Sequence, residues 1–346
     1  MSKTPSRETF IGNRLRLKDL HVFMVVARSG SMAKGADQLG ISQPAISEVI
    51  AGLEHALRVK LFDRNPRGVE LTAHGRSLLN RGIAAFDELS QGLEEMEALA
   101  HPGVGEVRIG SLDSISSGFL PPLIREFKEK YPRVVLQIDS VYTLSLGLPR
   151  VRDRSLDLVI TRLQKPDEAS SLADDLNLET LFDDHVVIAA GLQSRWARRD
   201  RVELEEIVDE PWVVPNPRAG SIVAEAYQAR GLKAPNISVV TSLVSLRAEL
   251  AATGDYLTSL PASVLRFNAE QFALKVLPVD LPPRPFPVVL ITLKRRTLNP
   301  AALRFIEHVR TFTKPLATAS LEEKNRARTG QRGRSKSSRV TRNTQS

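Results

Sequence analysis

Polar side chains that can form hydrogen bonds gather at the start of one short predicted helix near the N-terminus. Ser42 is placed to cap this helix, and Gln43, Ser47 and Glu48 are not needed for its apolar face. Amide and hydroxyl side chains at a helix N-terminus can hydrogen-bond base edges and phosphate oxygens. A glutamine can bind adenine through two hydrogen bonds, so Gln43 is the first candidate for recognising a base.

Basic residues follow this helix on a predicted tight turn. Arg64 and Arg67 lie beside Pro66 and Gly68, which mark the turn before a short strand near Val69. Arginines on such a turn suit contacts with the phosphates of a nucleic acid. The alternative is a plain helical hairpin that carries a solvated basic loop.

Two short helices joined by a glycine-containing turn must position these residues. A first amphipathic helix should end at Gly30, where glycine permits a C-terminal cap. Ser31 can cap a second helix over Met32–Leu39, which Gly40 ends. In the third helix Pro44 occupies the first turn, where its missing N–H costs nothing. This order predicts a helix-turn-helix with the third helix as the recognition helix.

The run GSMAKGADQLGISQPAISEVIAGLEHALRVKLFDRNPRGVELTAHG resembles the DNA-binding head of the LysR-type transcriptional regulators. The segments SQPAIS, LFDR and LTAHG and the LE pair all match. The resemblance implies a winged helix-turn-helix over residues 15–72 that binds a pseudo-palindromic promoter site on double-stranded DNA. It implies groove contacts at Ser42, Gln43, Pro44 and Ser47, and phosphate contacts at Lys34, Arg64 and Arg67.

Three positions depart from the family pattern. Gly35 replaces a usual alanine, which slightly weakens the second helix. Arg58 stands where a glycine is usual. Glu48 occupies a position that is usually basic or an amide; a carboxylate can accept a hydrogen bond from cytosine but repels phosphate. The role of Glu48 therefore stays open between binding a base and turning aside.

A long proline-free helix is predicted over residues 75–100, within a linker 73–103 that ends in a hinge at His101-Pro102-Gly103. Its apolar residues recur every seven positions at Leu79, Phe86, Leu93 and Ala100, with Leu89 and Met96 between them. Such a seam either packs on its own protein or joins two helices in a dimer. Similarity to the family favours a homodimer or homotetramer, and a dimer explains two half-sites on DNA.

The region 104–317 alternates strands and helices, which predicts an α/β domain with a largely parallel sheet. Ligands of such sheets bind at the carboxyl ends of the strands. A serine-rich loop, 111–118, follows the first strand and can either hold an anion or cap its own helix. Asp113 in this loop argues against a simple anion unless it points away or binds an amine.

This region also resembles the LysR-type effector domain, which is similar to a two-lobed periplasmic binding protein. The likeness implies a first lobe over 104–162 and 270–317, a second lobe over 163–269, and a small-molecule co-inducer between them. The residues implied to contact it are Ser111, Asp113, Ser114, Ser116, Thr161, Arg162 and Arg218. The two arginines suit an organic or sugar acid, while a surface role for each is the alternative.

Charge is uneven along the 346 residues, whose length suits several domains. The net charge is +8, with +5 over residues 1–80, −3 over 81–317 and +6 over 318–346. Residues 1–14 are expected to be flexible. The basic end 318–346 is expected to be disordered. It either adds non-specific affinity for DNA or keeps the chain soluble.

Catalytic motifs are missing from the sequence. The six histidines show no metal-ligand spacing, and there is no cysteine, no GxSxG and no phosphate-binding GxxxxGK[ST]. We therefore expect no enzyme activity, no metal and no cofactor. No signal peptide or membrane span is apparent, so the expected location is the cytoplasm, with RNA polymerase as a further partner. There are two alternatives: a solute-binding protein with an added DNA-binding head, and a purely architectural DNA-binding protein. The missing signal peptide disfavours the first alternative. The large α/β region disfavours the second.

Overall fold

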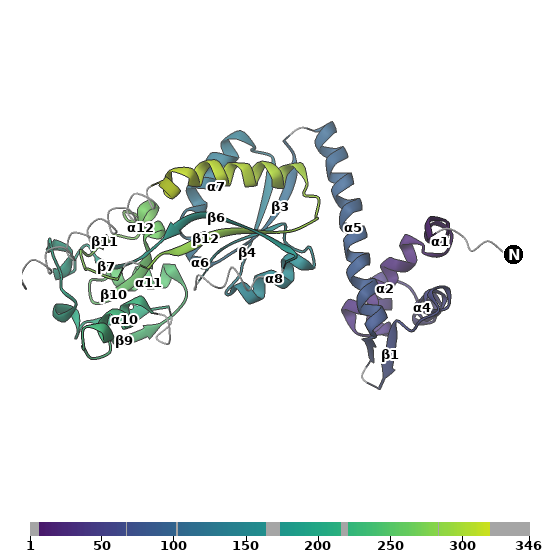
Figure 1. Ribbon diagram of the computed structural model, residues 1–346, viewed down its shortest axis with the longest axis horizontal. Coiled ribbons are helices and arrows are strands. Elements are labelled where there is room, and N and C mark those ends of the chain that lie inside the picture. The colour runs from purple at the N-terminus through teal and green to yellow at the C-terminus, as the bar shows by residue number, and fades with distance from the viewer. Residues whose placement is uncertain are drawn as a thin grey trace, which may run out of the picture. The chain divides into compact units, whose positions relative to one another are not determined.

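The computed structural model describes residues 7–66, 68–101, 103–163, 174–215, 221–282 and 284–318. The chain divides into two compact units, Met1–Leu93 and Glu94–Ser346, which Figure 1 shows with their element labels. None of the described helices is long and apolar enough to cross a membrane.

The N-terminal unit is helical, with a two-stranded wing. Its elements are α1 (Arg7–Arg14), α2 (Leu17–Ser29), α3 (Met32–Leu39), α4 (Gln43–Leu57), β1 (Phe62–Asn65), β2 (Gly68–Leu71) and the start of α5 (Ala73–Ala100). Within the segment 1–14, which the sequence analysis expected to be flexible, Arg7–Arg14 form the helix α1. This stretch contains no proline, and its helix is continued by a hydrogen bond from Leu15 N to Ile11 O of 3.2 Å.

Local caps set the ends of the helix-turn-helix as the sequence predicted. The Ser31 hydroxyl accepts from Lys34 N at 3.4 Å, and the Ser42 hydroxyl accepts from Ala45 N at 3.4 Å. Gly30 ends α2 at a φ of 63°, in the left-handed region that favours glycine. The apolar faces of the three helices share one core that includes Phe23, Val26, Ala36, Ile46 and Ile50.

The wing is attached to the end of α2. Its strands pair antiparallel, with Asn65 opposite Gly68. Val69 N donates to Gly30 O at 3.0 Å. A Cβ atom on Gly68 would lie 2.4 Å from that same oxygen, so only glycine fits this approach. The wing is therefore fixed against the C-terminal end of α2.

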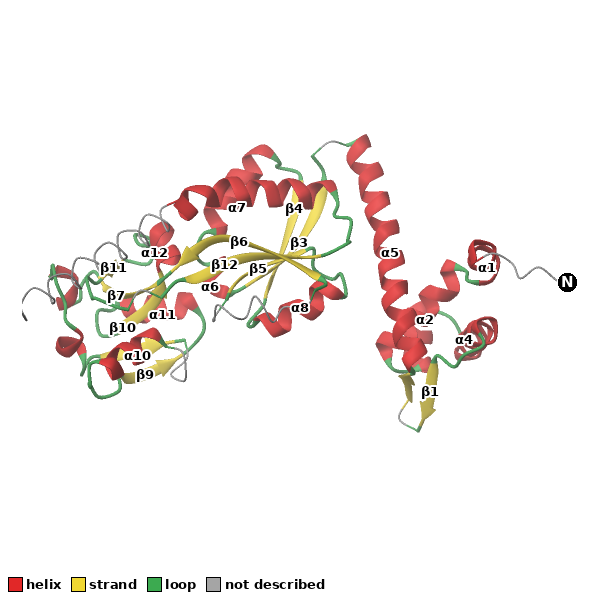
Figure 2. Ribbon diagram, viewed as in Figure 1, coloured by secondary structure: helices red, strands yellow, loops and turns green. Residues whose placement is uncertain are grey.

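The C-terminal unit contains two five-stranded sheets (Figure 2), each the centre of one lobe. The first sheet has the order β4-β3-β5-β12-β6 and the second has the order β11-β7-β10-β8-β9. The first lobe contains β3 (Gly105–Ser111), α6 (Asp113–Ser116), α7 (Leu120–Lys130), β4 (Val134–Ser140), α8 (Leu144–Arg152), β5 (Leu158–Arg162), β6 (Leu176–Asp184), β12 (Phe286–Leu293) and a final helix, 300–318. The second contains β7 (Val186–Gly191), the 3-10 turns η1 (Arg195–Arg198) and η2 (Leu204–Ile207), β8 (Pro211–Val214), α10 (Ile222–Ala229), β9 (Asn236–Val240), α11 (Val244–Ala252), β10 (Leu257–Pro261), α12 (Ala262–Asn268) and β11 (Leu274–Val276).

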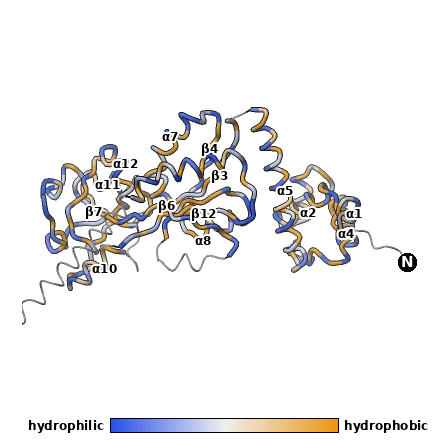
Figure 3. Tube along the Cα trace, turned by 45° about the horizontal axis from the view of Figure 1, so that its top comes forward, coloured by the Kyte–Doolittle hydropathy of each residue, from blue (hydrophilic) through white to orange (hydrophobic). Residues whose placement is uncertain are grey.

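Both faces of the first sheet are buried under helices. On β5, Leu158 and Ile160 join the core formed with α7 and the final helix, whereas Val159 joins the core on the α8 side. Strand β12 alternates in the same way. Burial on both faces explains the nearly continuous apolar runs of these strands. Figure 3 shows β12 coloured mainly as hydrophobic.

The sheet pairing differs from the sequence expectation in two respects. The sheets are mixed rather than largely parallel, because β12 runs antiparallel to both β5 and β6. The lobes also divide at other residues than 162 and 269. Strand β6 pairs with β12, so the first lobe extends to Asp184, and β11 pairs with β7, so the second extends to Val276. The chain thus crosses between lobes after β6 and after β11.

Candidate DNA-binding helix and interlobe polar site

The first turn of α4 presents polar side chains to solvent. Ser42, Gln43 and Pro44 are exposed, Ser47 is half-buried, and Glu48 is exposed. The opposite side of the helix is fixed by fully buried apolar residues of the core. The proposed groove residues therefore lie on one outward surface, and the Ser42 hydroxyl is engaged in capping the helix.

Two of the three predicted phosphate contacts are exposed cations of the N-terminal unit. Lys34 lies on α3, and Arg64 lies on β1 of the wing. Arg67 lies outside the described residues.

The glutamate of the LE pair positions the wing from inside. Glu54 is buried and accepts hydrogen bonds from Leu61 N at 2.8 Å, Phe62 N at 3.3 Å and Lys60 Nζ at 2.8 Å. Burial raises the pKa of Glu54, but these hydrogen bonds and the Lys60 charge outweigh burial and lower it overall. The carboxylate thus holds the segment that leads from α4 into the wing.

The LTAHG motif has a structural role at the start of α5. Thr72 Oγ1 accepts from Gly75 N at 3.0 Å and donates to Lys60 O at 2.7 Å. A Cβ atom on Gly75 would lie 2.1 Å from Leu61 O, so glycine is required there. This threonine and glycine let the long helix begin directly against the wing.

The second candidate site lies where the two lobes exchange strands. Arg162, at the end of β5, donates to Asp184 Oδ2 at 2.7 Å and to Ser114 Oγ at 3.1 Å. Asp184, at the crossover into the second lobe, also accepts from Ser263 N at 3.1 Å, Ser263 Oγ at 2.6 Å and His185 N at 2.9 Å. A buried ion pair therefore joins the first lobe, the crossover and α12.

A direct contact between the lobes lies next to this ion pair. Asp113 Oδ2, on α6 of the first lobe, accepts from Val244 N at the start of α11 at 2.7 Å. Arg247, one turn further along α11, is 3 % exposed and donates to Ser259 O at 2.6 Å. Burial lowers the pKa of Arg247 to about 10; the Asp113 carboxylate opposes this change, and the Arg162 charge adds to it.

The structure brings together three of the seven predicted effector residues: Asp113, Ser114 and Arg162. Thr161 is buried next to Arg162 on β5, and its Oγ1 atom has no hydrogen-bond partner among the described residues. Ser111 is fully buried, and its hydroxyl donates to Leu112 O at 3.2 Å. Ser116 is half-buried at the end of α6, and Arg218 lies outside the described residues.

Three residues of this site were missed by the sequence reasoning, namely Asp184, Arg247 and Ser263. Arg247 had a signal, because a charged residue stood on the apolar face of a predicted helix. Asp184 ends β6, a strand that the sequence reasoning did not predict. Among the described residues, no group of three or more His, Cys, Asp or Glu side chains is arranged to hold a metal ion.

Known proteins resemble both units. The family model described as "Bacterial regulatory helix-turn-helix protein, lysR family" matches residues 17–76, and the model described as "LysR substrate binding domain" matches residues 100–314. The HTH-type transcriptional regulator TdcA of Escherichia coli K12 is 32% identical over 260 residues, which cover 74% of this chain and 81% of TdcA. An uncharacterized HTH-type regulator of Bacillus subtilis 168, YybE, is 28% identical over 294 residues, covering 84% of this chain and 97% of YybE.

Solved structures share the fold. Full-length CbnR complexed with its target DNA is 21% identical with a TM-score of 0.56, covering 86% of this chain and 99% of CbnR. A full-length OxyR variant from Pseudomonas aeruginosa is 19% identical with a TM-score of 0.56, covering 86% of this chain and 94% of OxyR. The chain therefore belongs to the LysR family, as a DNA-binding transcription regulator with a helix-turn-helix domain and a substrate-binding domain for an effector.

Proposed function

We propose that α4 enters the major groove of a pseudo-palindromic promoter site, with Gln43 binding a base directly. The observation that carries this proposal is the exposed polar first turn of α4, backed by a fully buried opposite face. Ser42, Pro44 and Ser47 line the groove beside Gln43. Lys34, Arg64 and Arg67 contact phosphates and fix the register of the helix on the duplex.

Footprinting and binding to single-base variants of the site test the role of Gln43. Gln43→Ala should cost about 1–3 kcal/mol of discrimination at one base pair. Gln228→Ala, an exposed amide on α10 of the other unit, is the matched control and should leave selectivity unchanged. Equal selectivity of Gln43→Ala and the parent chain would contradict the assignment.

We propose that the chain assembles as a homodimer or homotetramer through the second half of α5. The seam divides: Leu79 and Phe86 pack against the core of the N-terminal unit, while Leu89, Leu93 and Met96 are exposed. Leu99 is 83 % exposed. Such a stripe at heptad spacing suits a second helix of the same kind, and a dimer would present two recognition helices to two half-sites.

We propose that a small molecule, an organic or sugar acid, binds between the lobes near Ser114, Thr161 and Arg162. Asp113, Ser111, Ser116 and Arg218 belong to the same proposed region. The ligand must bind one lobe arrangement more tightly than the other, because equal affinity would leave DNA binding unchanged.

Ser114→Ala tests this placement, because it removes the hydroxyl that Arg162 contacts. The full chain is screened by thermal shift against small organic acids, sugars and aromatic compounds. Any ligand-dependent rise in melting temperature should shrink in Ser114→Ala and persist in Ser77→Ala, an exposed serine on α5. An undiminished rise in Ser114→Ala would place the pocket elsewhere.

A regulator of this kind needs neither catalysis nor a cofactor, so we propose that the chain is not an enzyme. Its DNA target places it in the cytoplasm. RNA polymerase is the further partner through which promoter binding would change transcription.

A further inference from the structure

We infer that the Asp113 carboxylate fills an anion-binding position at the start of α11. We infer further that a small carboxylate acts as effector by displacing Asp113 from this position. This inference rests on the proposed interlobe effector site and names the class of ligand that the site takes. It also gives the ligand a means of changing the contact between the lobes.

The helix end is the first element of the anion position. The first N–H groups of a helix have no partner within the helix and favour negative charge. Helix α11 has nine residues, and its N-cap residue, Leu243, provides no side-chain cap. Asp113 supplies the missing acceptor from the other lobe, 131 positions away in the sequence. A carboxylate therefore already occupies this helix end.

Buried hydrogen-bond donors beside this helix end are the second, independent element. Arg247 is 3 % exposed, and its Nε atom has no hydrogen-bond partner among the described residues. The Nε atom of Arg162, whose charge acts on Arg247, also has none there. Arginine can only donate hydrogen bonds, so these unpaired donors favour a ligand group that only accepts hydrogen bonds. A carboxylate is such a group.

The nearby carboxylates of the protein do not accept hydrogen bonds from these unpaired Nε atoms. Asp184 already accepts four hydrogen bonds, from Arg162, His185 N and both polar groups of Ser263. Asp113 accepts from Val244 N through Oδ2, and its carboxylate forms no hydrogen bond with the Nε atom of Arg247 or of Arg162. A free carboxylate can turn so that one oxygen accepts from the helix and the other from a guanidinium.

Displacement of Asp113 by a ligand changes the contact between the two lobes. The bond from Val244 N to Asp113 joins α11 of the second lobe to α6 of the first. A ligand that takes the Val244 N–H from Asp113 breaks this contact and makes its own. It therefore has different affinities for the two lobe arrangements, which an effector requires.

The test is the variant Asp113→Asn in the full chain, with acetate and succinate as probes. Asparagine keeps an oxygen that can accept from Val244 N but removes the competing charge. Isothermal titration calorimetry should show binding of at least one probe, about tenfold tighter in Asp113→Asn than in the parent chain. Glu129→Gln makes the same charge change on an exposed residue of α7 and should leave the affinity unchanged. Asp113→Asn/Arg247→Lys should lose the gain, because lysine lacks the planar fork.

Equal affinity in the parent chain and Asp113→Asn overturns the inference, as does an equal gain in Glu129→Gln. Ethylammonium is the opposite probe. If it binds the parent chain and is lost in Asp113→Asn, while carboxylates do not gain, Asp113 pairs with an amine of the ligand and the inference is overturned. Absence of carboxylate binding to either protein also overturns it. The interlobe site itself fails only if no class of ligand produces a Ser114-dependent thermal shift, so the two failures are distinguishable.

Discussion

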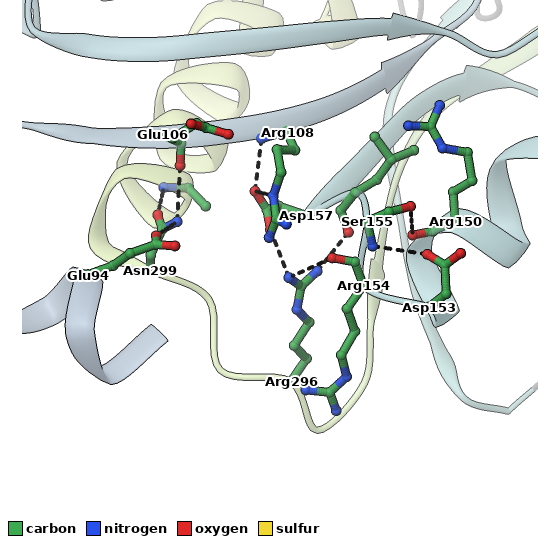
Figure 4. Close-up of polar contacts among 12 residues, drawn as sticks. Glu94, Glu106, Arg108, Arg150, Asp153, Arg154, Ser155, Asp157, Arg296 and Asn299 are labelled. Atoms are coloured by element: carbon green, nitrogen blue, oxygen red, sulfur yellow. Dashed lines mark hydrogen bonds and ion pairs between the residues drawn. The ribbon is translucent and has the colours of Figure 1, made fainter. Parts of the chain in front are cut away.

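The guanidinium of Arg296 lies 2.8 Å from the carboxylate of Asp157, and their side chains are 0 % and 1 % exposed. Figure 4 shows Arg108 on the other side of the same carboxylate, with Nη2 2.7 Å from Oδ1. Arg296 also donates to Leu156 O at 2.7 Å. One buried carboxylate thus joins β3, the start of β5 and the segment after β12.

Replacing Asp157 with alanine should destabilise the C-terminal unit strongly. The change removes a buried counter-charge of Arg296, which costs about 3–5 kcal/mol of unfolding free energy. Asp139→Ala is the control, because Asp139 pairs with Arg150 at the surface and its loss should cost under about 1 kcal/mol. Urea denaturation of both variants measures the difference, and similar losses would contradict the buried-pair account.

Gly75→Ala should destabilise the junction between the wing and α5. The new Cβ would lie 2.1 Å from Leu61 O, a backbone atom that cannot move aside easily, so we expect a loss of about 3 kcal/mol. Gly92→Ala on the same helix has no neighbour within 4 Å and should instead gain up to about 1 kcal/mol from helix propensity. Thermal melting of the two variants should therefore move in opposite directions.

Arg58→Gly should stabilise the N-terminal unit. Arg58 ends α4 at a φ of 56°, where a side chain is strained and glycine is not, so we expect a gain of about 1 kcal/mol. Arg58→Ala keeps a Cβ atom and should show no such gain. A rise in melting temperature for the alanine variant equal to that for glycine would show that charge, not backbone strain, is responsible.

Glu54→Gln should change how stability depends on pH. The folded state lowers the pKa of Glu54 from its ordinary 4.5. The stabilisation that its carboxylate gives the folded state is therefore fully present above pH 4.5 and is lost as the pH falls through the folded-state pKa. The variant should lose about 1–3 kcal/mol near pH 7. The difference in unfolding free energy between the variant and the parent chain should narrow in acid, as denaturation at a series of pH values would show. A gap that stays constant would contradict the lowered pKa.

Arg64→Ala should weaken DNA binding similarly on all sequences. If Arg64 contacts one phosphate, the slope of log affinity against log salt should fall by about 1, with base selectivity unchanged. Arg125→Ala, an exposed arginine on α7, should leave the slope unaltered. Fluorescence anisotropy over a salt series measures both, and a change in base selectivity with no change in slope would argue against a phosphate contact.

The sequence by itself determined the helix-turn-helix and the alternation of strands and helices over residues 104–317. Met32–Leu39, its Ser31 cap and the glycine end of α2 depend on residues within four positions of one another, so periodicity and capping preferences reveal them. The exposed first turn of α4 follows from the same local pattern.

Only the tertiary structure decided which polar groups meet between the lobes. Asp113 contacts Val244, and Asp184 contacts Ser263, across 131 and 79 positions of sequence. The strand β6 that carries Asp184 was missed, and the lobe boundaries were misplaced with it. Sheet order and crossovers set these meetings, and they arise from burying both faces of each sheet, a constraint that no short window of sequence expresses.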